Sequence, residues 1–217
     1  MIKTIQIETW ELALIIILLI VIAAIQIITV VFQQKIQEFF EKVRKNIKQK
    51  KTVQQVQYFI SNLASTLARL SYDRVGAIIV IENRDSLYKY INSGKKVDID
   101  FFPEFVFNIF YNHKSPLHDG AMIIRNLKIC SLSSYLPLTN RVISVEYGAR
   151  HRAAFGICEH YDCLSFVVSE TTGKISFTFK NKTNVLSSEP SKLIVELSNI
   201  WKSRSIFEKS LAPKLII

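Results

Sequence analysis

Two short motifs carry the side chains best suited to chemistry in this 217-residue sequence. The first is His118-Asp119-Gly120-Ala121, in which an aspartate and a glycine come directly before an apolar run. A carboxylate in this place can bind a metal ion or accept a proton, and glycine lets the backbone approach a ligand closely. Taken alone, an Asp-Gly pair before a strand is also explained as an ordinary turn.

The second motif is Arg150-His151-Arg152, which follows Gly148 and precedes a helix expected to begin near Ala153. The N-terminus of a helix presents free N–H groups and a partial positive charge, and both favour phosphate. Two arginines there would add bidentate donors for phosphate oxygens. Taken alone, a basic triplet in a surface loop is also explained by solvation.

A third segment, Ser169-Glu170-Thr171-Thr172-Gly173, ends a predicted strand with hydroxyls and one carboxylate, and it is also explained as a hairpin turn. The sequence contains no P-loop, G-x-G-x-x-G or H-E-x-x-H motif, so the common nucleotide and zinc signatures do not apply. Each segment is a weak signal by itself, and the order of the three is what matters.

These motifs lie at the ends of predicted strands and helices. Runs of β-branched and aromatic residues predict strands at 75–82, 119–125, 128–136, 164–170 and 174–180. Helical spacing, with Pro103 and Gly94 as a start and a stop, predicts helices at 86–94, 102–111, 151–160 and 190–205. This mixture predicts an α/β domain over residues 72–205, or an α+β domain if the late hairpins dominate.

Residues 12–32 form an uncharged apolar stretch, interrupted only by Gln26 and Thr29. As a helix this stretch would be about 32 Å long, close to the thickness of a bilayer core. A buried soluble helix would show a polar stripe, and a signal peptide would be shorter with a basic start. We therefore predict a single transmembrane helix that contacts the lipid bilayer.

Basic residues follow this stretch, since residues 33–51 hold seven lysines and arginines against two glutamates. Because basic flanks stay in the cytoplasm, residues 1–11 are expected outside the cell membrane and the C-terminal domain inside it. The formal net charge of +10 suits nucleic acid, anionic lipid or polyphosphate. The basic stretch lacks interleaved aromatic residues, so no nucleic-acid partner is expected.

The connecting segment, residues 33–71, has apolar residues at helical spacing. From Val53 to Leu70 these residues alternate in steps of three and four, which is typical of a heptad seam. Two interpretations remain open: a short coiled coil, or an amphipathic helix packed on its own domain. The change of spacing between Ile47 and Val53 suggests a bend or a change of face. The three cysteines, Cys130, Cys158 and Cys163, are expected to be free thiols.

In their order along the chain, GAIIVIE, SPLHDGAMII, SSYLPLT, GARHRAAFGI and LSFVVSETTGKIS resemble the diadenylate cyclase family, also called the DAC or DisA-N domain. The resemblance covers roughly residues 72–180. It implies a mixed sheet flanked by helices, and the condensation of two ATP into cyclic di-AMP with release of two pyrophosphates. It further implies a divalent cation, Mn²⁺ or Mg²⁺, and a homodimer with its active sites face to face.

The resemblance also implies roles for individual residues. Asp119, within Asp119-Gly120-Ala121, would activate the attacking 3′-hydroxyl beside the metal, with His118 as a further metal ligand. Arg150 and Arg152, with His151, would hold the β- and γ-phosphates. The remaining site residues would be Ser169 on phosphate, Glu170 on the metal, and Tyr135 with Leu136 around adenine.

The sequence departs from the family pattern at two positions. Thr171 stands where relatives have a second glutamate, and Ala149 stands where close relatives have threonine. These departures motivate an alternative, a membrane-bound adenine-nucleotide sensor with impaired catalysis. Most membrane relatives have three spanning helices, and a single one resembles the shortened type found in wall-less bacteria. The roles of the tail, residues 206–217, and of any regulatory partner stay open.

Overall fold

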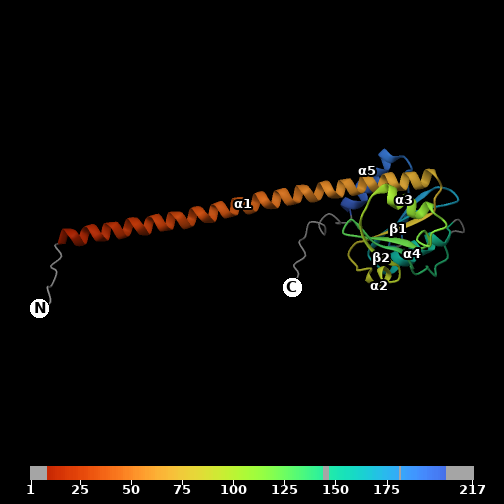
Figure 1. Cartoon of the computed structure of the whole chain (residues 1–217), viewed down its shortest axis with the longest axis horizontal. Helices are drawn as coiled ribbons and strands as arrows, with labels where there is room; N and C mark the ends of the chain where they lie inside the picture. Colours follow the sequence, from red (N-terminus) through yellow and green to blue (C-terminus); the bar gives the residue numbers. More distant parts are fainter. Residues whose placement is uncertain (1–8, 144–146, 181, 204–217) are drawn as a thin grey trace. The chain divides into compact units, whose positions relative to one another are not determined.

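The computed structural model describes residues 9–143, 147–180 and 182–203 (Figure 1). The chain divides into two compact units, residues 1–51 and residues 52–217. Helix α1, Thr9–Tyr72, contributes residues to both units, and the interval between Ile47 and Val53, where a bend or a change of face was expected, lies within this helix. The predicted tail at 206–217 and most of the predicted N-terminal segment at 1–11 lie outside the described residues.

The described residues of the first unit belong to α1. Its described large apolar side chains between Leu12 and Ile27 are each 43–65% exposed. Within the part of the chain that the structure describes, no helix meets the length and hydropathy required to cross a membrane. The end of the predicted span, residues 28–32, has no described side chains.

The second unit is built around a seven-stranded sheet whose order is β2-β4-β3-β1-β5-β6-β7. The strands are β1 Ala77–Glu82, β2 Lys95–Asp100, β3 Ala121–Arg125, β4 Lys128–Ser134, β5 Cys163–Val168, β6 Ile175–Phe179 and β7 Lys182–Leu186. Strands β1 and β3 are parallel, and the other neighbouring pairs are antiparallel. The α/β prediction with a mixed central sheet is confirmed.

One face of the sheet is covered by the end of α1, by α3 Pro103–Tyr111 and by α5 Pro190–Ser203 (Figure 1). The apolar seam of α1 is buried here: Val56, Ile60, Leu63, Leu67 and Leu70 are at most 3% exposed. Of the two open interpretations, the helix packed on its own domain is therefore correct for this stretch. The compact unit that contains this packed stretch begins at Thr52.

The opposite face is covered by two shorter helices, α2 Tyr88–Ile91 and α4 Ala149–His160. Their apolar side chains pack on Ile78, Val80 and Ile123. All three cysteines are free, as predicted, and Cys158 and Cys163 are buried here. Burial also raises the pKa of the Cys130 thiol to about 11, which keeps this group protonated.

The five strands expected from the sequence are all present, and the hairpin between β3 and β4 turns at Asn126 and Leu127. Both of these residues have a positive φ, of 52° and 66°. This is the backbone of a two-residue hairpin turn that follows the twist of the sheet. The edge strands β2 and β7 were not expected.

Candidate active site

The sheet topology brings the predicted site residues to one edge. Strands β1 and β3 run parallel and both begin at this edge, since Ile79 pairs with Met122. Strand β5 is antiparallel to β1 and ends there, because Val168 pairs with Ala77. Strand β4 ends there too, opposite the start of β3. The same side of the sheet therefore holds the residues that precede β1 and β3 and the residues that follow β4 and β5.

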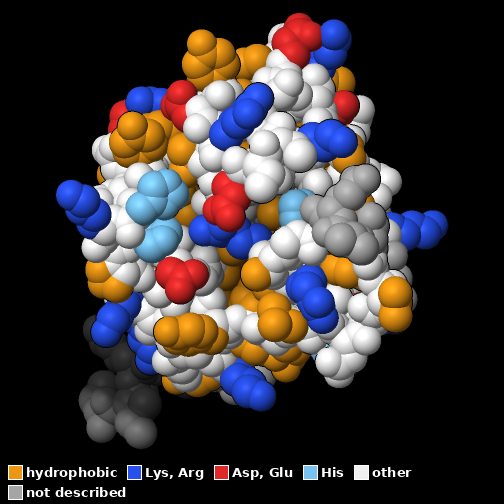
Figure 2. Space-filling view, turned by 90° about the vertical axis from the view of Figure 1, so that its right-hand side faces the viewer, with side chains coloured by type: hydrophobic (Ala, Val, Ile, Leu, Met, Phe, Trp, Pro, Cys, Tyr) orange, Lys and Arg blue, Asp and Glu red, His pale blue; other side chains and the backbone are white. Residues whose placement is uncertain are grey.

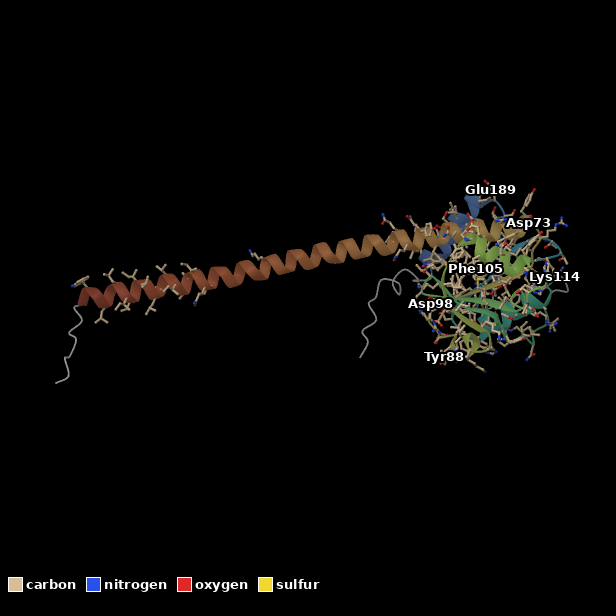
Figure 3. All side chains as sticks on the ribbon, in the orientation of Figure 1. Asp73, Tyr88, Asp98, Phe105, Lys114 and Glu189 are labelled. Carbon is tan, nitrogen blue, oxygen red and sulfur yellow. The ribbon has the colours of Figure 1, made fainter. Side chains whose placement is uncertain are left out.

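The figures agree with this topology. Asp73 and Lys114, which shortly precede β1 and β3, lie on the side of the domain away from Asp98 (Figure 3). Figure 2 shows the domain from that side, where acidic, basic and histidine side chains gather around a hollow bordered by apolar side chains. This arrangement is a concave polar centre within an apolar rim, as in many ligand sites.

Asp119 lies two residues before β3 and is exposed. Its Oδ1 accepts a hydrogen bond from the Gly120 N–H at 3.0 Å. Gly120 has φ +84°, and a Cβ there would lie 2.9 Å from the carbonyl carbon of Ser133. Only glycine fits this turn, which packs directly on the end of β4 and presents the Asp119 carboxylate to solvent.

One ring nitrogen of His118, Nδ1, hydrogen-bonds to the backbone, and the other, Nε2, is the candidate metal ligand. Its Nδ1 lies 2.6 Å from the Ser115 carbonyl oxygen, which can only accept, so Nδ1 carries the proton. In the neutral ring Nε2 then keeps its lone pair, as in metal-binding histidines oriented by a backbone carbonyl. The His113 ring packs edge-on against it at 5.3 Å between centroids.

A mostly apolar cavity of about 160 Å³ opens beside Asp119, lined by Ile78, Asp119, Gly120, Ala121, Ser134, Tyr135, Leu136, Leu138, Ala149, Arg150 and Ala153. Tyr135 is 72% exposed at its mouth. Ser93 fixes the backbone of Tyr135, because the Tyr135 N–H donates to the Ser93 Oγ at 3.1 Å. On the far side Gly156 touches the Pro137 carbonyl so closely that no Cβ would fit.

A second, more polar cavity of about 410 Å³ adjoins the first and shares Ala149 and Arg150 with it. Its lining comes from the start of α4 and the end of β5, namely Gly148–His151 and Val167–Thr171. Arg150 Nη1 donates to Glu170 Oε2 at 2.8 Å, with side chains 23% and 61% exposed. Arg150 thus stands at the boundary between an apolar and a polar compartment.

The ion pair lies directly on the backbone at Gly76. A Cβ at this position would be 2.6 Å from Arg150 Nη1 and 2.8 Å from Glu170 Oε2. Gly76 is therefore a site residue that the sequence reasoning missed. The available signal was a glycine immediately before a buried strand, which often marks a close approach to a backbone.

Helix α4 begins at Ala149, with Gly148 as its N-cap, and this corrects the expected start near Ala153. Arg150, His151 and Arg152 therefore lie in the first turn of the helix and not in the loop before it. Residues two apart on a helix point to different faces. Accordingly Arg150 lines both cavities, whereas Arg152 is exposed and is not among the residues lining either one.

His151 lines the polar cavity, but its ring is buried and only 6% of the residue is exposed. Its Nε2 lies 3.3 Å from the Ser176 Oγ on β6, and the Tyr147 ring packs on it at 4.9 Å. Burial lowers the pKa of His151, so the imidazole is neutral near pH 7. This geometry suits a residue that anchors α4 to the sheet.

Ser169 and Thr171 hydrogen-bond to each other. The two hydroxyl oxygens are 3.0 Å apart, and the Thr172 N–H donates to the Ser169 Oγ at 3.3 Å. Thr171 therefore helps to close the turn after β5. In this arrangement Glu170 is the carboxylate of the turn that faces Arg150.

The described residues contain no group of three or more His, Cys, Asp or Glu side chains arranged to hold a metal ion. Asp119 and Glu170 instead lie singly in the two cavities that share Arg150. Mg²⁺ is commonly held by one or two carboxylates together with substrate phosphates. The carboxylates present fit a cation that arrives with a polyphosphate.

Comparison with known proteins gives a consistent result. Residues 64–183 match the family model described as DisA bacterial checkpoint controller nucleotide-binding. A diadenylate cyclase of Mycoplasma genitalium is 50% identical over 165 residues, which cover 76% of this chain and 79% of that protein. A diadenylate cyclase of Mycoplasma pneumoniae is 54% identical over 135 residues, covering 62% of this chain and 67% of that one.

A solved structure agrees as well. A double mutant of DacA from Staphylococcus aureus superposes with a TM-score of 0.61 at 37% identity, covering 67% of this chain and 94% of that chain. The range matched by the family model, residues 64–183, includes Gly76, Asp119, Arg150 and Glu170.

Proposed function

Since this chain belongs to the diadenylate cyclase family, we propose that it is a nucleotidyltransferase that condenses two ATP into cyclic di-AMP and two pyrophosphates. One observation carries the proposal. Asp119, Arg150 and Glu170 meet at one sheet edge around two adjoining cavities, one mostly apolar and one polar. This division matches a substrate with an aromatic base at one end and a triphosphate at the other.

The apolar cavity would take the adenine. Leu136, Leu138 and Ile78 offer an apolar surface to the base, and Tyr135 stands at the mouth as an aromatic side chain that can stack on it. The hydrogen bond from Ser93 and the close contact between Gly156 and Pro137 fix the backbone of residues 135–138 before the base binds. A preorganised pocket lowers the entropy cost of binding.

The polar cavity would take the phosphates. The first N–H groups of α4 and the Arg150 guanidinium both face it, and both favour anions. During the reaction Arg150 would stabilise the charge that develops on the departing pyrophosphate. Ser169 adds a hydroxyl at the same cavity, although its Oγ also accepts from the turn backbone.

Asp119 would accept the proton of the attacking 3′-hydroxyl. The oxygen then forms a bond to the α-phosphorus of the facing ATP, and the bond from that phosphorus to the bridging oxygen of pyrophosphate breaks. A bound Mn²⁺ or Mg²⁺ would screen the triphosphate charge and polarise the α-phosphate. Asp119, His118 and Glu170 are the residues proposed to hold it. A second, symmetric transfer closes the ring.

The roles of His151 and Arg152 are refined by their positions. His151 is proposed to hold α4 on β6 through Ser176, so that it acts on phosphate through Arg150. Arg152, exposed on another face of α4, is proposed to reach the phosphates of the ATP bound by the facing protomer. Mutation of Arg152 should then lower turnover more than the affinity of one chain for ATP.

Ring closure requires two ATP molecules facing one another, and we propose a homodimer that supplies them. Apolar side chains at the cavity mouth are strongly exposed, Tyr135 at 72% and Leu138 at 56%. Exposed apolar surface beside a site is typical of a protein interface. A two-fold axis through this face would place each active site opposite its copy.

We propose that residues 12–32 span the cell membrane once, with the enzymatic domain in the cytoplasm. The support is the uncharged apolar run and the basic residues that follow it. Membrane fractionation of cells expressing the chain, followed by protease treatment of intact spheroplasts, tests this proposal. A domain digested from outside, or a chain recovered without membranes, would contradict it.

The activity is tested with the full-length chain purified in mild detergent and supplied with ATP and Mn²⁺ or Mg²⁺. We expect cyclic di-AMP and two pyrophosphates per product. Asp119→Asn should lower kcat about 100-fold or more, the range for loss of a general base. Asp98→Asn, an exposed aspartate of β2 at the other side of the domain, is the matched control.

Two outcomes would overturn parts of this proposal. Tight ATP binding without pyrophosphate release, with either metal, would identify a nucleotide sensor in place of an enzyme. Full activity of Asp119→Asn would leave the enzyme in place but exclude this carboxylate as the proton acceptor.

A further inference from the structure

A buried serine at the end of α1 hydrogen-bonds to the turn that contains Glu170. Ser71 is 9% exposed, and its Oγ donates a hydrogen bond to the Gly173 carbonyl oxygen at 2.5 Å. The two backbones are in contact, because a Cβ at Gly173 would lie 2.7 Å from the Ser71 carbonyl oxygen. Gly173 also has φ +71°, so glycine is required there for conformation and for space.

The same segment contacts the site at a second point. After Ser71 the chain turns through Arg74, whose φ is 52° and whose N–H donates to the Ser71 carbonyl oxygen at 3.2 Å. It then reaches Gly76, on which the carboxylate of Glu170 rests. Segment 71–76 therefore touches the Ser169–Lys174 turn on the Gly173 side and on the Glu170 side.

Other contacts do not place this turn equally well. The ion pair between Glu170 and Arg150 is partly exposed, and such pairs contribute little in water. Hydrogen bonds within the turn, such as Gly173 N–H to the Ser169 carbonyl at 2.9 Å, fix its shape but not its position. By contrast, loss of the buried Ser71 hydroxyl would leave the Gly173 carbonyl without that donor.

We propose that Ser71 is a positioning residue for this enzyme: its hydroxyl holds the Ser169–Lys174 turn so that Glu170 stays beside Arg150 at the polar cavity. The inference rests on the proposed part of Glu170 in holding the divalent cation. Ser71 acts on that carboxylate through the backbone of the turn. Outer residues that orient a ligand in this way change metal affinity roughly 10-fold or more when mutated.

The test compares full-length Ser71→Ala with Ser71→Thr, which keeps the hydroxyl. Thr66→Val is the matched control, because the Thr66 hydroxyl is buried on the same helix but donates to the Asn62 carbonyl of that helix. Three measurements are made: the affinity for Mn²⁺ with a non-reactive ATP analogue, amide hydrogen exchange of residues 169–174, and kcat with KM for ATP.

Ser71→Ala should weaken Mn²⁺ binding roughly 10-fold and speed exchange in the turn, while kcat at saturating Mn²⁺ stays near that of the wild type. Ser71→Thr should keep the wild-type Mn²⁺ affinity and the wild-type exchange rate in the turn. Thr66→Val should change neither of these two quantities. If Ser71→Ala does not fold, Ser71→Cys replaces it, because the thiol is of similar size but a weaker donor.

Unchanged Mn²⁺ affinity and unchanged exchange in Ser71→Ala would overturn the inference, even if that variant melts at a lower temperature. The proposed function fails separately. If the wild type makes no cyclic di-AMP, the enzymatic proposal is lost, whereas the exchange comparison still decides whether Ser71 holds the turn.

Discussion

The ion pair between Arg150 and Glu170 leaves no space for a side chain at Gly76. At Gly76 even a methyl group would meet the guanidinium at 2.6 Å and the Glu170 carboxylate at 2.8 Å. Both of these neighbours are ends of flexible side chains that can move away. The third neighbour, the Cβ of Glu170 at 3.0 Å, would have to shift by a few tenths of an ångström, so we expect the protein to fold with alanine there. The ion pair would then leave the wall that the two cavities share.

We therefore predict that Gly76→Ala lowers kcat/KM for ATP about 10-fold or more, because a small displacement of catalytic groups is costly. The thermal midpoint should change little, since the clash is relieved at a partly exposed pair. Steady-state kinetics and a melting curve on the same preparation check this. A variant with normal kinetics would show that the position of the pair does not matter for turnover.

His151 provides a pH dependence of stability. Burial holds its folded-state pKa below the unfolded value of about 6.5, so the unfolded chain binds the proton more readily. The free energy of unfolding should therefore fall as the pH drops below about 6.5, and this loss should grow until the folded-state pKa is reached.

His151→Gln should weaken that dependence, which melting curves between pH 5 and pH 8 would detect. His160→Gln, an exposed histidine on the same helix, is the control and should keep the wild-type dependence. Equal pH dependence in both variants would contradict the assignment. Glutamine is chosen because its side-chain amide can still hydrogen-bond to the Ser176 hydroxyl, which contacts the histidine ring in the wild type.

At the scale of single residues, the sequence predicted which residues lie at the same site, but it did not predict the direction in which each side chain points. Asp119, Arg150 and Glu170 were expected at one site, and they line adjoining cavities. Arg152 was expected beside Arg150, but the earlier start of α4 turns it to another face. Gly76 and Ser71 act through close backbone contacts between segments distant in sequence, and a motif search does not reveal such contacts.

At the scale of elements, the predicted strands share one property: most of their residues are buried. Strand β1 is buried at almost every position, and its continuous apolar run was therefore recognisable. The two strands that were missed lie at the sheet edges, where Lys95–Asp100 alternates exposed and half-buried residues and Lys182–Leu186 is mostly exposed. Charged residues on edge strands discourage pairing with other chains, and they also remove the apolar signal.

Helix α1 illustrates the same limit. Its seam had the spacing of a coiled coil and also of a helix packed on a sheet, since both require apolar residues three and four apart. Burial against α3, α5 and the sheet decides between them for residues 56–70. Sequence spacing identifies an apolar face but does not identify what covers it.

A mutation in this seam tests the packing. Leu63 is fully buried in the core cluster, so Leu63→Ala should lower the free energy of unfolding by about 2–5 kcal/mol. The loss should be independent of protein concentration, because the contacts lie within one chain. Tyr58→Ala, at an exposed position of the same helix, is the control and should change stability far less. A concentration-dependent loss would indicate a coiled coil.

At the scale of the whole molecule, the proposed reaction would need more than one chain. In that proposal, a single ATP bound between Asp119 and Arg150 would have no second α-phosphate to attack, so formation of the product would depend on a facing copy. In a two-fold interface each substitution appears twice and meets itself or its neighbours. A surface residue near the axis is therefore a sensitive probe of assembly.

Val142 follows residues 135–138, which line the apolar cavity, and it is fully exposed, so the fold of one chain does not depend on its side chain. Val142→Glu would place two like charges in the proposed interface, and we predict about a 10-fold loss of specific activity at low protein concentration. ATP affinity of the single chain should be unchanged. Val195→Glu, exposed on α5, should behave like the wild type.

Concentration then separates assembly from chemistry. If Val142→Glu weakens the dimer, its specific activity should rise as the protein is concentrated in detergent. It should also rise in liposomes, where two chains held by the proposed membrane span would share a small volume and meet more often. Wild-type activity of Val142→Glu at every concentration would place the dimer interface elsewhere on the domain. A constant deficit at every concentration would instead assign Val142 to the active site.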